Sequence, residues 1–292
     1  MKKLGMPQKI IIFSIIAVAF SVMITISMQE NFSKNETYSY DGPPRAAIID
    51  QLHDDLPSIY FQDRATELLE TAGYEVELFT TKQLTVDFYK RLPLMNYEYI
   101  VFRTHAIGND EKDIASGKEP VSLFTGEKYR EDKYITEQLS GQIGKGAPYM
   151  SSVLDVSVDL SELTNSNKTS IEIDVTSTSQ VVDDSNPYFL IGSKYVDDIM
   201  EGRFHDSVLV LGGCSTLSSP TLAKSLINRG ASSVIGWDNL VGSINNDNTI
   251  LEFLENHLIN EMEIEDAVEA AMSKVPKGSQ YNANFSYYKE SV

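Results

Sequence analysis

Strand-like and helix-like segments alternate along this chain from Arg45 to Lys274, and this alternation constrains the fold more than any other feature. Short aliphatic and β-branched runs, typical of buried strands, are each followed by a stretch with apolar residues at helical spacing. Strands that alternate with helices in this way predict one α/β domain, with a doubly wound, mostly parallel sheet and helices on both faces. A domain of this length buries an ample core without disulfides.

The expected elements follow from the same patterns. The strands are predicted at 46–52, 74–79, 97–104, 207–211 and 231–235, and the helices at 62–72, 84–92, 134–143, 194–200, 221–228, 249–259 and 263–274. Gly73 and Gly230 are expected to end helices. Three segments depart from the alternation: a hairpin about Thr125-Gly126 within 121–129, a β-rich insertion at 151–182, and a polar, aromatic tail at 276–292 without periodicity.

The only cysteine, Cys214, follows the strand-like run 208–211 and two glycines, and a helical pattern opens soon after at Pro220. His105 follows the strand predicted at 97–104 in the same way. In open α/β sheets, ligands and catalytic groups lie at the carboxyl ends of strands. A lone cysteine is more often a small buried apolar residue, but the shared placement of a thiol and an imidazole favours a Cys–His dyad. The following helix N-terminus would favour the thiolate.

The other histidines are weaker candidates for a catalytic base. His53 also follows a predicted strand and stays in reserve, whereas His205 precedes a strand and His257 lies within a predicted helix. The sequence lacks a glycine-rich phosphate loop, a Gly-x-Ser-x-Gly elbow and Cys/His pairs at metal-ligand spacing. We therefore expect neither a metal nor another cofactor.

The N-terminus predicts a membrane segment. Lys2, Lys3 and Lys9 precede an uncharged, mostly apolar run, 10–27, which is at the lower limit for a transmembrane helix. The positive-inside rule places the N-terminus in the cytoplasm and the domain outside it. We expect a single-pass signal anchor at 1–28 followed by a polar tether at 29–44; cleavage of a signal peptide and secretion is the alternative.

The formal net charge of −18 argues against nucleic acid as a partner, because phosphate binding requires the opposite sign. Solubility is sufficient to explain such acidity. Four Asn-x-Ser/Thr sequons, at Asn31, Asn35, Asn167 and Asn284, are compatible with an exported protein. The oligomeric state stays open.

Several of these motifs together resemble a known family. The runs 189–192, 200–205 and 208–214 resemble the nucleophile region of caspase-fold (clan CD) cysteine peptidases, and 222–237 is similar to the same stretch of gingipain-like and CHAT-type members. In that family a strand ending in cysteine is followed by a helix, a Gly-Ala corner and a strand ending near Gly-Trp. The resemblance covers most of 46–274, is strongest over 203–237, and leaves the insertion unexplained.

The resemblance implies a caspase-like fold and a cysteine-type endopeptidase that acts on a protein or peptide. Cys214 would attack the peptide carbonyl, and His105 would protonate the leaving amine and later assist water. The backbone N–H groups of Cys214 and Ala106 would form the oxyanion hole. Family members usually carry glycine where this chain has Ala106, so an inactive caspase-like binding module is the alternative. A transpeptidase built on the same residues is a third reading.

The resemblance to caspase-fold peptidases further implies that the loop after the strand predicted at 231–235 lines the pocket for the residue before the scissile bond. Here it contains Trp237 and Asp238, which suit a lysine or arginine through a cation–π contact and a charge pair. Asp238 could equally cap the following turn.

Overall fold

The computed structural model describes residues 42–151, 180–182, 186–275 and 282–288. Its larger sheet has six strands in the order β12-β11-β10-β3-β1-β2, of which all but β12 run parallel. These strands are β1 (Arg45–Asp50), β2 (Glu75–Thr80), β3 (Tyr99–Arg103), β10 (Ser207–Gly212), β11 (Ala231–Trp237) and β12 (Phe285–Tyr288). The predicted α/β class and the mostly parallel sheet are confirmed.

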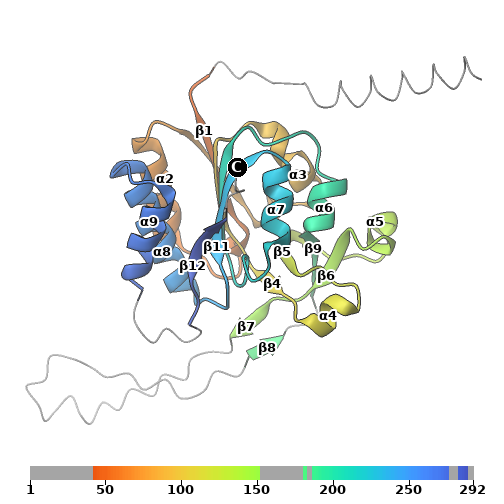
Figure 1. The fold of residues 1–292 in the computed structure, drawn as a ribbon. Coiled ribbons are helices and arrows are strands. Elements are labelled where there is room, and N and C mark those ends of the chain that lie inside the picture. The colour runs from red at the N-terminus through yellow and green to blue at the C-terminus, as the bar shows by residue number, and fades with distance from the viewer. Residues whose placement is uncertain (1–41, 152–179, 183–185, 276–281, 289–292) are drawn as a thin grey trace, which may run out of the picture. The chain divides into compact units, whose positions relative to one another are not determined.

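Helices cover both faces of this sheet (Figure 1). One face carries α2 (Ile59–Thr71), α8 (Ser243–Leu254) and α9 (Ile264–Ser273), and the other carries α3 (Val86–Arg91), α6 (Ser193–Asp198) and α7 (Pro220–Asn228). Alternate strand residues point to opposite faces, so Ala46 and Ile48 join the first core while Ala47 and Ile49 join the second. Strand β1 is thus apolar on both faces, as a central parallel strand must be.

A second, antiparallel sheet was not predicted. Its order is β4-β5-β9-β6, formed by β4 (Ala106–Gly108), β5 (Val121–Lys128), β9 (Tyr188–Gly192) and β6 (Ile143–Gly146). Two short helices, α4 (Glu111–Ala115) and α5 (Ile135–Leu139), lie in its connections.

The expected hairpin about Thr125-Gly126 is wrong, because β5 runs through both residues as a single strand with an irregularity between Phe124 and Lys128. Gly126 serves a close approach of two backbones rather than a turn. A Cβ atom there would lie 1.7 Å from the Thr81 carbonyl oxygen, and the Gly126 N–H donates to Leu84 O at 2.7 Å.

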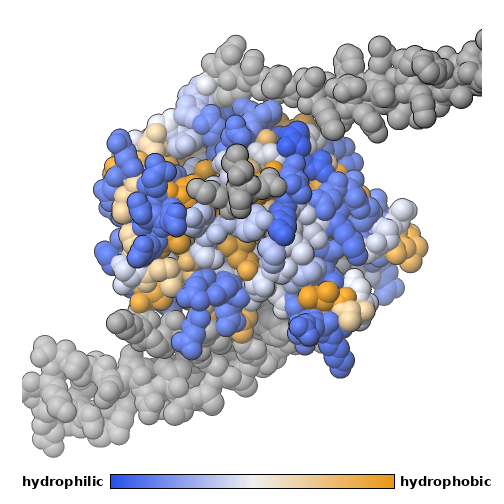
Figure 2. All heavy atoms as spheres, in the orientation of Figure 1, coloured by the Kyte–Doolittle hydropathy of each residue, from blue (hydrophilic) through white to orange (hydrophobic). Residues whose placement is uncertain are grey.

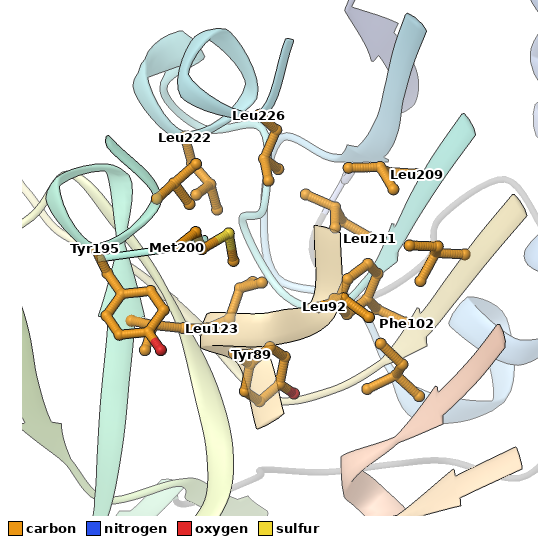
Figure 3. Close-up of a cluster of buried hydrophobic side chains, with 14 of the residues drawn as sticks. Tyr89, Leu92, Phe102, Leu123, Tyr195, Met200, Leu209, Leu211, Leu222 and Leu226 are labelled. Carbon is orange, nitrogen blue, oxygen red and sulfur yellow. The ribbon is translucent and has the colours of Figure 1, made fainter. Parts of the chain in front are cut away.

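A cluster of buried apolar side chains joins the two sheets (Figure 3). Phe102 and Leu211 extend from the larger sheet, Leu123 from the smaller one, and Tyr195 and Leu222 from the helices above them. The smaller sheet therefore shares the core of the larger one. This shared core also fixes the position of β4, the strand of the smaller sheet that directly follows His105.

The described part of the tail also differs from the prediction. Residues 285–288 form β12, which pairs antiparallel with β11 through Phe285 opposite Trp237. A partner this distant in sequence leaves no local periodicity to detect. The helix expected at 134–143 is limited to α5, because Tyr134 has φ 54° and Ile143 belongs to β6. The helix expected from residue 249 begins earlier, at Ser243, and a π-turn at Glu255–Ile259 extends it.

The anchor expected at 1–28, most of the tether and most of the β-rich insertion expected at 151–182 lie outside the described residues. At the two ends of the insertion, β7 (Tyr149–Ser151) and β8 (Gln180–Val182) pair antiparallel. Among the helices that the structure describes, none has the length and apolarity needed to cross a bilayer. The visible surface is mainly hydrophilic, with apolar side chains gathered over α5, where Ile135 and Leu139 are exposed (Figure 2).

Candidate active site

Strands β3 and β10 are parallel neighbours, and their pairing brings the two candidate catalytic residues to one edge. Arg103 lies opposite Gly212, and the Thr104 N–H still donates to Gly212 O at 2.8 Å. Cys214 and His105 each come two residues after this last pair, at the same carboxyl edge of the sheet. The two chains stay close beyond the pair, because a Cβ on Gly213 would lie 2.4 Å from Thr104 O.

Cys214 lies in a turn that is hydrogen-bonded to the end of β11. Ser215, with φ 57°, donates its N–H to Asn239 O, and Leu217 donates to Trp237 O. The thiol is partly buried, and its Sγ donates to Val241 O at 3.5 Å. Burial raises the pKa of the Cys214 thiol, and main-chain groups of Val241 and Cys214 offset part of this shift. This shift favours the protonated thiol.

His105 lies where the chain leaves the larger sheet and enters the smaller one. Its backbone N–H donates to the Gln51 side-chain oxygen at 2.9 Å, and its carbonyl accepts from the Phe124 N–H at 3.0 Å. The imidazole meets the Phe124 ring edge to face at 5.8 Å. Its Nε2 is buried and has no hydrogen-bond partner among the described residues.

The surroundings of His105 favour the neutral imidazole. Burial lowers its pKa from 6.5 to about 4, the nearby Asp55 carboxylate opposes that shift, and Arg103 adds to it. Within the described residues, no hydrogen bond joins the imidazole to the Cys214 sulfur. The pKa shifts of the two groups thus favour a neutral Cys214 thiol and a neutral His105 imidazole over a thiolate–imidazolium pair.

Ala106 begins β4, the edge strand of the smaller sheet. It lies opposite Leu123, and the flanking bonds run from Phe124 N to His105 O and from Asn109 N to Pro120 O. In an antiparallel ladder this spacing makes Ala106 and Leu123 a non-hydrogen-bonded pair. The Ala106 N–H therefore points away from β5.

The two expected substrate-binding residues have structural roles. The indole of Trp237 is 1% exposed, packs against Phe285 and donates its Nε1–H to Asn246 at 3.0 Å. It therefore belongs to the core, and the expected cation–π contact with a substrate is not supported. Asp238 is exposed, and its carboxylate accepts from the Asn284 N–H at 2.7 Å and from Asn284 Nδ2 at 2.8 Å. Asp238 thus holds the strand β12 beside β11.

A buried charge cluster beneath the site was missed. Arg103 is 1% exposed, and its guanidinium donates to Asp247 at 2.8 Å and to Asp50 at 3.0 Å. Gln62 donates to Asp50 at 2.6 Å and lies 2.8 Å from His53 Nδ1. Two carboxylates and one guanidinium in the core are tolerated because they are paired and hydrogen-bonded. The sequence feature that could have indicated this cluster is the presence of Asp50 and Arg103, two residues of opposite charge, in otherwise apolar predicted strands.

The topology does not bring the remaining histidines to the end of the strand beside β10. His53 ends the 3-10 helix after β1, and β3 lies between β1 and β10 in the sheet. His205 precedes β10 at the opposite edge. His257 stacks on Phe253 at 5.6 Å. The topology therefore favours His105 as the partner of Cys214.

Across the described residues, no group of three or more His, Cys, Asp or Glu side chains is arranged to hold a metal ion. No protein-family model matches this chain, and no curated protein matches it. A functional assignment therefore rests on the fold and on the geometry around Cys214 and His105.

Proposed function

We propose that this chain is a cysteine peptidase with a caspase-like fold that cleaves peptide bonds through a Cys214–His105 dyad. One observation carries the proposal: Cys214, the only cysteine of the sequence, and His105 each follow by two residues the last paired residues of the neighbouring parallel strands β10 and β3. Both therefore lie at the carboxyl edge of the sheet, where catalytic groups of such folds are found. The order of elements from β10 through α7 to β11 also agrees with the sequence resemblance.

The chemistry follows from a neutral pair. As the sulfur of Cys214 bonds to the peptide carbonyl carbon, its proton passes to His105, and the carbonyl oxygen becomes an oxyanion. The Ala106 N–H, together with that of Cys214, would stabilise this charge. His105 then gives the proton to the departing amine, which leaves a thioester. Water attacks that thioester, His105 takes the water proton, and the thiol is released with a carboxylic acid.

The location and the substrate are part of the same proposal. A signal anchor at 1–28 would hold the domain outside the cytoplasm, with secretion after cleavage as the alternative. The substrate would be an extracytoplasmic protein or peptide, and the net charge of −18 would favour basic segments.

A peptidyl thiol-reactive probe tests the mechanism on the full-length chain, because Cys214 is its only thiol. The parent should be labelled and should cleave a denatured protein substrate. Cys214→Ala should abolish both signals, and His105→Ala should reduce them by about 10²-fold or more. His53→Ala is the matched control, and turnover by the Cys214→Ala variant would exclude the mechanism.

A second candidate function is an inactive caspase-like binding module. It is favoured by the protonated thiol, which donates to Val241 O instead of contacting His105. Alkylation with iodoacetamide at pH 7 separates the two functions. An alkylation rate of Cys214 that is no greater than that of a free thiol, and that is unchanged in His105→Ala, supports the binding module. A separate peptide assay addresses the third interpretation: if a peptide product forms only when an amine acceptor is added, the chain is a transpeptidase.

A further inference from the structure

The end of β1 leaves a gap in the hydrogen bonding of β3, and one side chain fills it. The last residue of β1, Asp50, lies opposite Arg103, and the chain then turns into a 3-10 helix at Gln51–His53. Thr104 bonds to β10 on one side, so the next N–H, that of His105, faces the side where β1 has already ended.

The Gln51 side chain provides the hydrogen-bond acceptor that a longer β1 would have provided to the His105 N–H. It is fully buried, and its Oε1 accepts from the His105 N–H at 2.9 Å. The Gln51 carbonyl in turn accepts from Thr81 Oγ1 at 3.1 Å, which fixes the turn that carries the side chain. Together with the Phe124 N–H on the His105 carbonyl, this contact holds the His105 backbone on both sides.

The other end of the Gln51 amide is unusual. Its Nε2 is buried with no hydrogen-bond partner in the described residues, and the same is true of His105 Nε2. Buried polar atoms are nearly always paired. Gln51 and His105, which are joined by the bond from the His105 N–H, therefore each carry one buried polar atom without a partner among the described residues.

We propose that Gln51 is the positioning residue of the candidate dyad, fixing where His105 leaves the sheet relative to Cys214. This inference rests on the proposed function for its catalytic meaning, but the placement of His105 can be measured independently of activity. Gln51 does not touch the thiol; it acts through the His105 backbone.

Three variants of the full-length chain test the role. Gln51→Met matches the shape and removes both the acceptor and the donor. Gln51→Glu keeps an acceptor for the His105 N–H. Gln62→Met is the matched control, because Gln62 is a buried glutamine of the neighbouring charge cluster whose side chain contacts Asp50 and His53. Hydrogen–deuterium exchange of the His105 amide and labelling of Cys214 by the thiol probe are measured at equal folded fraction.

We expect the His105 amide to exchange about tenfold faster in Gln51→Met and at the parental rate in Gln51→Glu. Probe labelling should fall about tenfold or more in the first variant and recover in the second, while Gln62→Met should leave both readouts unchanged. Parental exchange at His105 in Gln51→Met would overturn the proposal. If the parent itself is never labelled, the peptidase function fails, but faster exchange in Gln51→Met and its recovery in Gln51→Glu would still establish Gln51 as the anchor of His105.

Discussion

Protonation of His105 should destabilise the fold, and the size of the effect follows from its surroundings. Burial lowers the His105 pKa from 6.5 to about 4. Below pH 6.5 the imidazole becomes protonated in the unfolded chain, whereas in the folded chain it stays neutral down to about pH 4. Stability is therefore unaffected by His105 above pH 6.5 and decreases as the pH falls through this window.

Complete protonation of His105 should lower the free energy of unfolding by about 3 kcal/mol, since each unit of pKa difference is worth about 1.4 kcal/mol. About 2 kcal/mol of this decrease should occur between pH 7.5 and pH 5. The assay is urea unfolding of the parent and of His105→Gln at both pH values. Each protein is compared with itself, so any general destabilisation by the substitution cancels.

The parent should lose about 2 kcal/mol more than His105→Gln between the two pH values. His205→Gln, at the opposite edge of the sheet, is the matched control and should retain the parental loss. Equal pH dependence in the parent and in His105→Gln would refute the reasoning, because the imidazole would then be as well solvated in the folded chain as in the unfolded one.

Three further predictions concern the framework of the site. Arg103→Met leaves two buried carboxylates without their cation and should cost about 3–5 kcal/mol in urea unfolding. Gly126→Ala places a Cβ against the Thr81 carbonyl and should cost about 1–3 kcal/mol, whereas Gly242→Ser, with nothing within 4 Å, should change stability by less than about 0.5 kcal/mol. Asp238→Ala removes two hydrogen bonds to Asn284 and should speed amide exchange in β12 about tenfold; unchanged exchange would show that side-chain packing alone holds this strand.

The larger sheet could be predicted because its information is local. The runs that become β3 and β10 are apolar on both faces, and this pattern is typical of central parallel strands. Gly73 and Gly230 both have positive φ, +95° and +106°, as expected for residues that end helices. These features depend on neighbours a few residues away, so the sequence shows them directly.

The smaller sheet depends on contacts between distant residues. Strand β9 pairs with β5 and β6, which precede it by more than forty residues, and strands of three to eight residues carry little periodicity. Gly126 was ambiguous for the same reason: a glycine in a strand indicates either a turn or a close backbone approach. Only the position of Thr81 decides between them.

The candidate site was predictable in position but not in its contacts. Cys214 and His105 could be placed at strand ends from the alternation alone. That Sγ donates to Val241 O, or that Gln51 holds the His105 N–H, depends on loops whose paths no local pattern records. Trp237 misled for a related reason, because a residue at a strand end can face either the solvent or the core, and here the core contains its partner Asn246.

Two glycines, rather than a hydrogen bond between the Cys214 and His105 side chains, allow the turn that carries Cys214 to lie close to the main chain around His105. A Cβ on Gly213 would lie 2.4 Å from Thr104 O, and one on Gly108 would lie 2.7 Å from the Cβ of Ser215. The turn that carries Cys214 therefore rests directly on the main chain on either side of His105. Because backbone packing of this kind is stiff, the thiol and the imidazole keep their places without a hydrogen bond to each other. Under the proposed function, this edge would be arranged before a substrate binds, and peptide cleavage would require the thiol proton to move from Val241 O to His105.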